Sequence, residues 1–76
     1  MTAQQLVAFY DKHKDKLVTV QLKCGDVFER VWMDSCPHTT YQGNEVAVLY
    51  TAAEHEPDKP THAHPVDAID FIEGIE

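Results

Sequence analysis

The hydrophobic period of the chain changes at Leu17, and this change restricts the fold more than any other feature. Before it, apolar and ring-bearing residues recur at the spacing of one helical face: Leu6, Phe9, Tyr10, His13 and Leu17. Thr2 and Gln5 have capping-box spacing, so we predict a helix from about Ala3 to about Lys14. Its apolar stripe is expected to pack in the core, because so short a chain needs that stripe.

From Leu17 onward, apolar and polar residues alternate instead. Val18, Val20 and Leu22 point one way, as a half-buried strand requires, and residues 24–26 supply a tight turn. The next run, Val27–Asp34, carries large apolar groups on both of its faces. Such a strand is either covered on both sides or bent so that its inward face changes midway. A bend is the usual way in which a few strands close into a barrel.

Further breaks divide the rest of the chain. We expect an interruption at residues 35–38, a turn at 41–44, a strand at 45–51, an exposed loop at 54–61, and a final short strand that contains Val66, Ile69, Phe71 and Ile72. The predicted fold is mainly β: an N-terminal helix followed by a bent, antiparallel, five-stranded small barrel. At 76 residues the chain makes one domain, 1–76, with a small core, so a homo-oligomer is expected.

One stretch carries a recognisable motif, a Val-x-Val-x-Leu-x-x-Gly strand and turn followed by a long strand. With an apolar C-terminal segment it resembles the Sm-like small β-barrel, and an SH3-like barrel fits nearly as well. The matching residues are Val18, Val20, Leu22, Gly25, Phe28, Trp32, Ile69 and Ile72. The resemblance implies a barrel that assembles into rings or dimers through strand edges.

The chain departs from that family at three places. Arg30 stands where a second glycine usually permits sharp curvature, and Cys36 stands at an acidic position, with Asp34 two residues away. The family's second motif contains an Arg-Gly pair that helps hold a uridine base in RNA-binding members. The corresponding stretch here is Thr61–Val66, without such a pair. The resemblance therefore does not carry uridine recognition to this chain.

Charge is distributed unevenly along the chain. Thirteen acidic residues against six basic ones give a formal charge of −7, and from Glu45 onward Lys59 is the one basic residue against eight acidic ones. Nucleic acid usually requires clustered Lys and Arg, so RNA binding is disfavoured. The basic group near the predicted helix end, residues 12–16, is explained by the helix dipole. If RNA or another partner does bind, the candidate contacts are Lys12, Lys14, Lys16, Lys23, Arg30 and Tyr41.

Histidine and cysteine supply the candidates for metal chemistry. Cys36 and His38 form one pair, and His62 and His64 form another whose alternation would put both imidazoles on one face of a strand. Zinc needs three or four such ligands, which these pairs could provide, although the spacing matches no established zinc motif. Pro65 makes a loop with exposed histidines the favoured interpretation. We therefore predict no metal site, no cofactor and no catalytic residue; charging all five histidines would change the net charge from −7 to −2.

Aromatic residues offer a further binding hypothesis. Trp32, Phe28 and Tyr41 could form a platform of the kind that binds oligonucleotides or peptides, but core packing of the first two is favoured. No run is long enough to span a membrane, and residues 1–5 lack the features of a signal peptide, so a cytoplasmic protein is expected. We therefore predict a non-enzymatic binding or assembly module that contacts a protein through an acidic surface. An RNA-binding Sm-like ring and a metal-binding protein are the alternatives.

Overall fold

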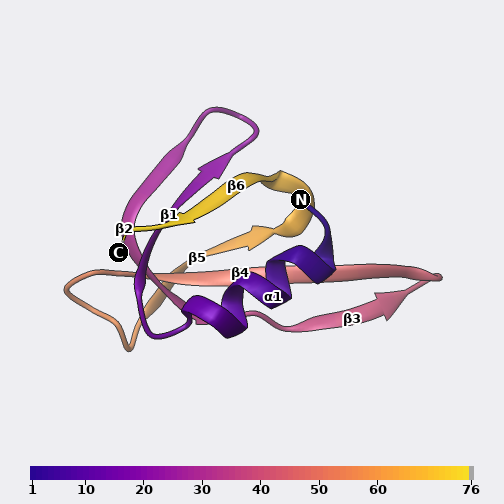
Figure 1. Cartoon of the computed structure of the whole chain (residues 1–76), viewed down its shortest axis with the longest axis horizontal. Coiled ribbons are helices and arrows are strands. Elements are labelled where there is room, and N and C mark those ends of the chain that lie inside the picture. Colours follow the sequence, from indigo (N-terminus) through magenta and orange to yellow (C-terminus); the bar gives the residue numbers. More distant parts are fainter. Residues whose placement is uncertain (76) are drawn as a thin grey trace.

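The computed structural model describes residues 1–75 and consists of one N-terminal helix and an antiparallel sheet of six strands (Figure 1). This confirms the predicted mainly β fold with an N-terminal helix. None of the described helices is long and apolar enough to cross a membrane. In chain order the elements are α1 (Ala3–His13), β1 (Leu17–Leu22), β2 (Val27–Ser35), β3 (His38–Tyr41), β4 (Asn44–Ala53), β5 (Pro60–Pro65), the 3₁₀ turn η1 (Val66–Ala68) and β6 (Ile69–Gly74).

Helix α1 begins with the predicted capping box. The Thr2 hydroxyl accepts a hydrogen bond from the Gln5 amide at 3.1 Å, and the Gln5 side chain accepts one from the Thr2 amide at 2.9 Å. Two amides that lack a partner within the helix are thereby satisfied. Leu6 is fully buried and Phe9 packs against the core, so the apolar stripe is a core face, as predicted. Tyr10 donates a hydrogen bond to the Asp34 carbonyl at 3.2 Å and ties the helix to the end of β2.

Strand β2 is bent by a bulge, which confirms the second of the two interpretations of its sequence. Val18 pairs with Val31 and Val20 with Phe28, so β2 has one residue more than β1 across this interval. Arg30 lies in the bulge with φ of 55°, a left-handed conformation that glycine adopts more easily. The extra residue changes the inward face: Phe28 points inward before the bulge, and Val31 does so after it.

The sheet is open within the described residues, so the expected closed five-stranded barrel is not observed. Its strand order is β3-β4-β2-β1-β6, with β5 paired to β4 on a separate branch. The strand count differs because residues 38–41, directly after the expected interruption, and residues 60–65, directly before Val66, form the strands β3 and β5, which the sequence analysis did not assign. The last strand also starts later than expected, at Ile69, because Val66–Ala68 forms the 3₁₀ turn after Pro65.

Strands β3 and β4 form a hairpin that projects from the rest of the molecule (Figure 1). Its two-residue loop has positive φ at both positions, 51° at Gln42 and 81° at Gly43, as a type I′ turn requires. Strand β5 pairs with β4 only from Val48 of β4 onward, and β2 pairs with β4 only from Tyr50 of β4 onward. Residues 44–47 of β4 therefore pair with β3 alone. The hairpin segment 38–47 is called the arm below.

Candidate functional site

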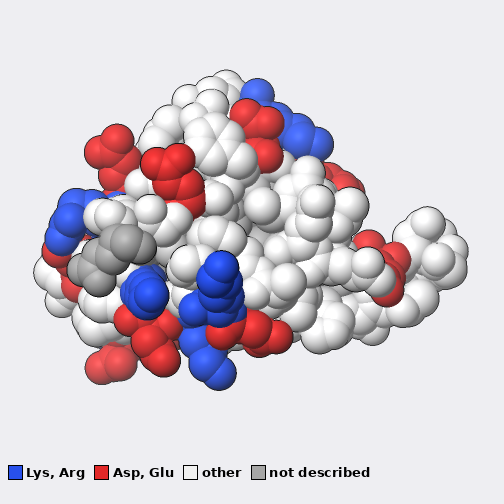
Figure 2. Space-filling view, in the orientation of Figure 1, with Lys and Arg blue, Asp and Glu red and all other residues white. Residues whose placement is uncertain are grey.

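The predicted basic contact residues are spread over several elements. Lys12 lies in α1, Lys14 and Lys16 lie between α1 and β1, and Lys23 lies in the β1–β2 turn. Tyr41 lies at the end of β3, in the arm. In Figure 2 the Lys and Arg side chains form separate groups with Asp and Glu side chains among them. The structure does not bring the predicted set together into one basic surface.

Arg30, the remaining member of that set, is engaged by an acidic residue. Its guanidinium donates to both carboxylate oxygens of Glu54, at 2.7 and 3.0 Å. These hydrogen bonds lower the pKa of Glu54. The same residue's carbonyl accepts a hydrogen bond from the Trp32 indole at 3.0 Å. The bulge of β2 is thus fastened to the loop that follows β4.

The three aromatic residues of the predicted platform have different surroundings. Trp32 is half-buried against the Glu54 carbonyl, whereas Phe28 packs on the histidines of β5. Tyr41 is 63% exposed in the arm. Packing of Phe28 against the core and exposure of Tyr41 agree with the favoured prediction, whereas Trp32 is half-buried and does not belong to the core cluster.

The predicted metal ligands are not gathered into a site. Among residues 1–75 no group of three or more His, Cys, Asp or Glu side chains is placed to hold a metal ion. Cys36 follows β2, His38 begins β3, and the other two histidines lie on β5. Burial, followed by the nearby charge of Asp11, raises the pKa of the Cys36 thiol. A thiol held in its protonated form is a poor metal ligand and a poor nucleophile.

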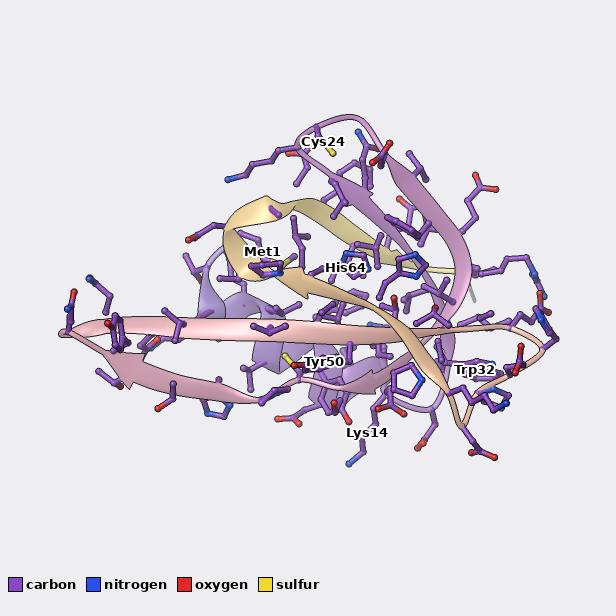
Figure 3. The ribbon with its side chains drawn as sticks, turned by 180° about the vertical axis from the view of Figure 1, so that it is seen from behind. Met1, Lys14, Cys24, Trp32, Tyr50 and His64 are labelled. Carbon is purple, nitrogen blue, oxygen red and sulfur yellow. The ribbon has the colours of Figure 1, made fainter. Side chains whose placement is uncertain are left out.

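His62 and His64 lie on a strand, not in the exposed loop that we expected, because β5 begins at Pro60. Their rings stack with centroids 5.9 Å apart, and each packs on Phe28 at 4.7 and 4.9 Å respectively. His64 is only 3% exposed, lies in the interior of the curved sheet (Figure 3), and shares a 3.1 Å hydrogen bond with Thr51. Burial and the neighbouring His62 lower the pKa of His64. His64 is therefore a packed residue of the core, whereas His62 is exposed on the same face of β5, as expected for an exposed histidine.

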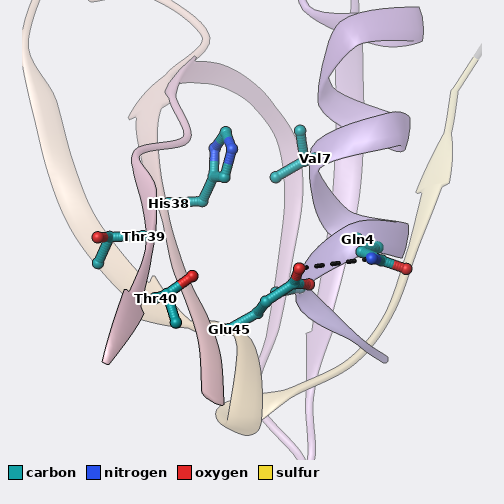
Figure 4. Close-up of a pocket in the computed structure, with 7 residues that line it drawn as sticks. Gln4, Val7, His38, Thr39, Thr40 and Glu45 are labelled. Atoms are coloured by element: carbon teal, nitrogen blue, oxygen red, sulfur yellow. Dashed lines mark hydrogen bonds between the residues drawn. The ribbon is translucent and has the colours of Figure 1, made fainter. Parts of the chain in front are cut away.

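A groove lies between α1 and the arm (Figure 4). Its volume is about 430 Å³, and it is lined by Ala3, Gln4, Val7, His38, Thr39, Thr40 and Glu45. The Gln4 amide donates to the Glu45 carboxylate at 3.4 Å across the groove. The lining offers a single carboxylate and no cluster of titratable groups. The groove is therefore a candidate binding surface beside the arm.

The outer edge of β3 forms one side of the arm and has no strand beside it among residues 1–75. The Pro37 carbonyl accepts from the Val48 amide at 3.1 Å, so the residues that hydrogen-bond to β4 are Pro37, Thr39 and Tyr41. The alternation of an antiparallel ladder then directs the backbone amides and carbonyls of His38 and Thr40 outward. These groups are available to another strand.

The strand edges of the molecule differ in how they are protected. Strand β6 carries Asp70 and Glu73, and β5 has proline at both ends, Pro60 and Pro65. Charges and prolines on edge strands are the usual means of preventing unwanted pairing. Strand β3 contains neither, and Glu45 is the one Asp, Glu, Lys or Arg between Ser35 and Ala53. The outer edge of β3 is therefore the candidate functional site.

The sequence contained part of this signal, since the uncharged stretch around the arm is visible in it. The sequence analysis assigned no strand to residues 38–41, and it did not show that this segment lies at an edge of the sheet. No family model, curated protein or solved structure matches the chain. The functional conclusion accordingly depends on the geometry of the chain itself.

Proposed function

We propose that this protein is a non-enzymatic binding and assembly module that takes up another polypeptide by β-strand addition at the outer edge of β3. The observation that carries this proposal is that β3 alone among the edge strands β3, β5 and β6 has neither a charged residue nor a bounding pair of prolines. In strand addition, main-chain hydrogen bonds supply affinity, and the pockets beside the edge supply selectivity. The groove along α1 is placed to receive side chains of the added strand.

The order of elements supports a resemblance to the Sm-like and SH3-like folds, in an open sheet and not in a closed barrel. A helix, a strand, a bent segment, a long strand, and two short strands separated by a 3₁₀ turn follow one another. Such folds act by binding other molecules in many unrelated contexts, so the fold alone does not name the partner. The acidic surface that the sequence suggested as a protein contact, from Glu54 onward, lies outside the arm, so strand addition at β3 assigns it no direct contact.

The alternative functions have weaker support. RNA binding would need the dispersed basic residues to act together, and Arg30 is already paired with Glu54. Metal binding would need a third ligand beside His62 and His64. Strand addition needs only backbone groups that already point outward.

The test begins by selecting peptides that bind this protein from a random phage-displayed library. Hydrogen exchange of the protein's backbone amides is then measured by NMR with and without a selected peptide. Binding at the edge is expected to protect the His38 and Thr40 amides, which point away from β4, while leaving the Thr39 amide nearly unchanged. Thr40→Pro removes the outward amide, and Thr40→Val is its matched control because it keeps the amide and removes only the hydroxyl. Selected peptides that bind Thr40→Pro as tightly as wild type, or that protect other residues instead, would overturn the proposal.

A further inference from the structure

We infer that the strand that β3 takes up is β3 of a second copy, so that the protein forms a two-fold dimer through its arms. This inference rests on the proposed function, because it names the partner of the same edge. It concerns a pairing of identical segments, which requires the edge to be complementary to itself in register, in charge and in side-chain packing.

The register follows from the outward backbone groups of β3. In an antiparallel pair related by a two-fold axis, His38 stands opposite Thr40 of the second copy, and Thr40 stands opposite its His38. Each of these pairs exchanges both of its backbone hydrogen bonds, because these residues direct their amides and carbonyls outward. Thr39 then faces Thr39 of the other copy across the axis. This register uses every outward group of β3.

The charges of the arm favour pairing with an identical copy. Two chains of charge −7 repel each other, and the arm is where they can meet with the fewest charges facing. Its one charged residue, Glu45, lies on β4 and not at the edge. The two Glu45 side chains would be separated by three strand spacings, roughly 14 Å, which exceeds the screening length at physiological salt. A foreign strand rich in basic residues would find no complementary charge on β3.

The side chains of the arm also match across the axis. Thr39 faces its own equivalent, and cross-strand threonine pairs stabilise antiparallel sheets. Tyr41 would stand beside Pro37 of the second copy. On the face away from α1, Tyr41 is 63% exposed and Val46 is 37% exposed. A two-fold axis perpendicular to the sheet places the Tyr41 and Val46 side chains of both copies on the same face of the joined sheet, where they form one continuous surface. Pairing thereby removes apolar surface from water while both α1 helices remain on the opposite face.

The first test is solution mass by light scattering between micromolar and millimolar concentration. Wild type is expected to pass from monomer to dimer, Thr40→Val to do the same, and Thr40→Pro to weaken dimerisation on the order of tenfold or more, because each copy loses one outward amide. A chain that stays monomeric at millimolar concentration would overturn the inference. So would a dimer that Thr40→Pro leaves intact.

The second test determines the register by disulfide trapping in a Cys24→Ser, Cys36→Ala background. In the inferred pairing the two Thr39 Cα atoms lie about 4.5 Å apart, within the range of a disulfide. Thr39→Cys is therefore expected to form a covalent dimer on mild oxidation. Tyr41→Cys is the matched control, because the two Tyr41 positions would be roughly 13 Å apart along the strands. Equal cross-linking of both variants would contradict the register.

The experiments distinguish a failure of strand addition at β3 from a failure of the dimer. If selected peptides protect His38 and Thr40 while the chain remains monomeric, strand addition stands and the second copy is not the partner. If neither peptides nor a second copy protect these amides, both proposals are wrong.

Discussion

Arg30 shows how one residue can occupy a position that the resemblance assigns to glycine. Its φ of 55° provides the bulge that bends β2, and its guanidinium binds Glu54. A side chain in the left-handed region costs about 1–2 kcal/mol. The ion pair with Glu54 is half-exposed, and such pairs contribute little stability. The bend is therefore maintained by the pairing of β2 with β1 and β4, against a local backbone cost.

This interpretation predicts that Arg30→Gly is more stable than Arg30→Ala by about 1 kcal/mol. Both substitutions remove the contact with Glu54, so the difference between them isolates the backbone conformation. Urea denaturation followed by Trp32 fluorescence gives the two free energies of unfolding. Equal stability of the two variants would show that residue 30 does not adopt a left-handed conformation in solution.

The prediction from sequence was most clearly wrong for the environment of His64, which is buried and not exposed. Because His64 directly precedes Pro65, the sequence indicated a polar loop at this position. The side chain is buried instead, because it contacts Phe28 and Thr51, which are distant in sequence. Its lowered pKa means that the unfolded chain binds a proton more readily than the folded one. Folding stability is therefore complete above the ordinary histidine pKa of 6.5 and falls as the pH decreases below it.

We predict that the free energy of unfolding decreases more steeply for wild type than for His64→Gln as the pH is lowered from about 7.5 to about 5.5. His55→Gln is the control, because His55 is exposed in the loop after β4. It should keep the slope of wild type. A slope that persists in His64→Gln would assign the effect to other groups.

At the scale of elements, local signals were sufficient where the deciding residues are neighbours in sequence. The capping box at Thr2, the alternation in β1 and the break at Pro37 are of this kind, and α1 and β1 were predicted to within a residue or two. The closure of the sheet was wrong because it depends on which distant strands pair. Likewise, the sequence shows that Glu45 is the one Asp, Glu, Lys or Arg of the arm, but the edge position of β3 is set by β2 and β5, which pair with other parts of β4.

At the scale of the whole molecule, the arm separates the candidate binding edge from most of the charge. The molecule extends 38 Å along its longest axis and 24 and 21 Å along the others, and the arm projects at one end (Figure 1). Most of the acidic residues of the second half lie instead in the loop after β4 and along η1 and β6. Two copies joined by their arms would keep these acidic regions apart, although long-range repulsion between chains of charge −7 would remain.

This remaining repulsion determines whether added salt strengthens or weakens the dimer. The screening length shortens from about 30 Å at 0.01 M salt to about 10 Å at 0.1 M, so added NaCl weakens the repulsion while the backbone hydrogen bonds of the arm are unaffected. We therefore predict that the dimer dissociation constant decreases severalfold over this range, measured by sedimentation equilibrium. The double variant Asp70→Asn, Glu73→Gln lowers the net charge from −7 to −5 without touching the arm, and it should dimerise more tightly at low salt with a flatter dependence. An association that salt weakens would instead indicate contact between opposite charges, such as the basic residues 12–16 against the acidic loop. It would exclude the edge of β3, which carries no Asp, Glu, Lys or Arg, as the interface.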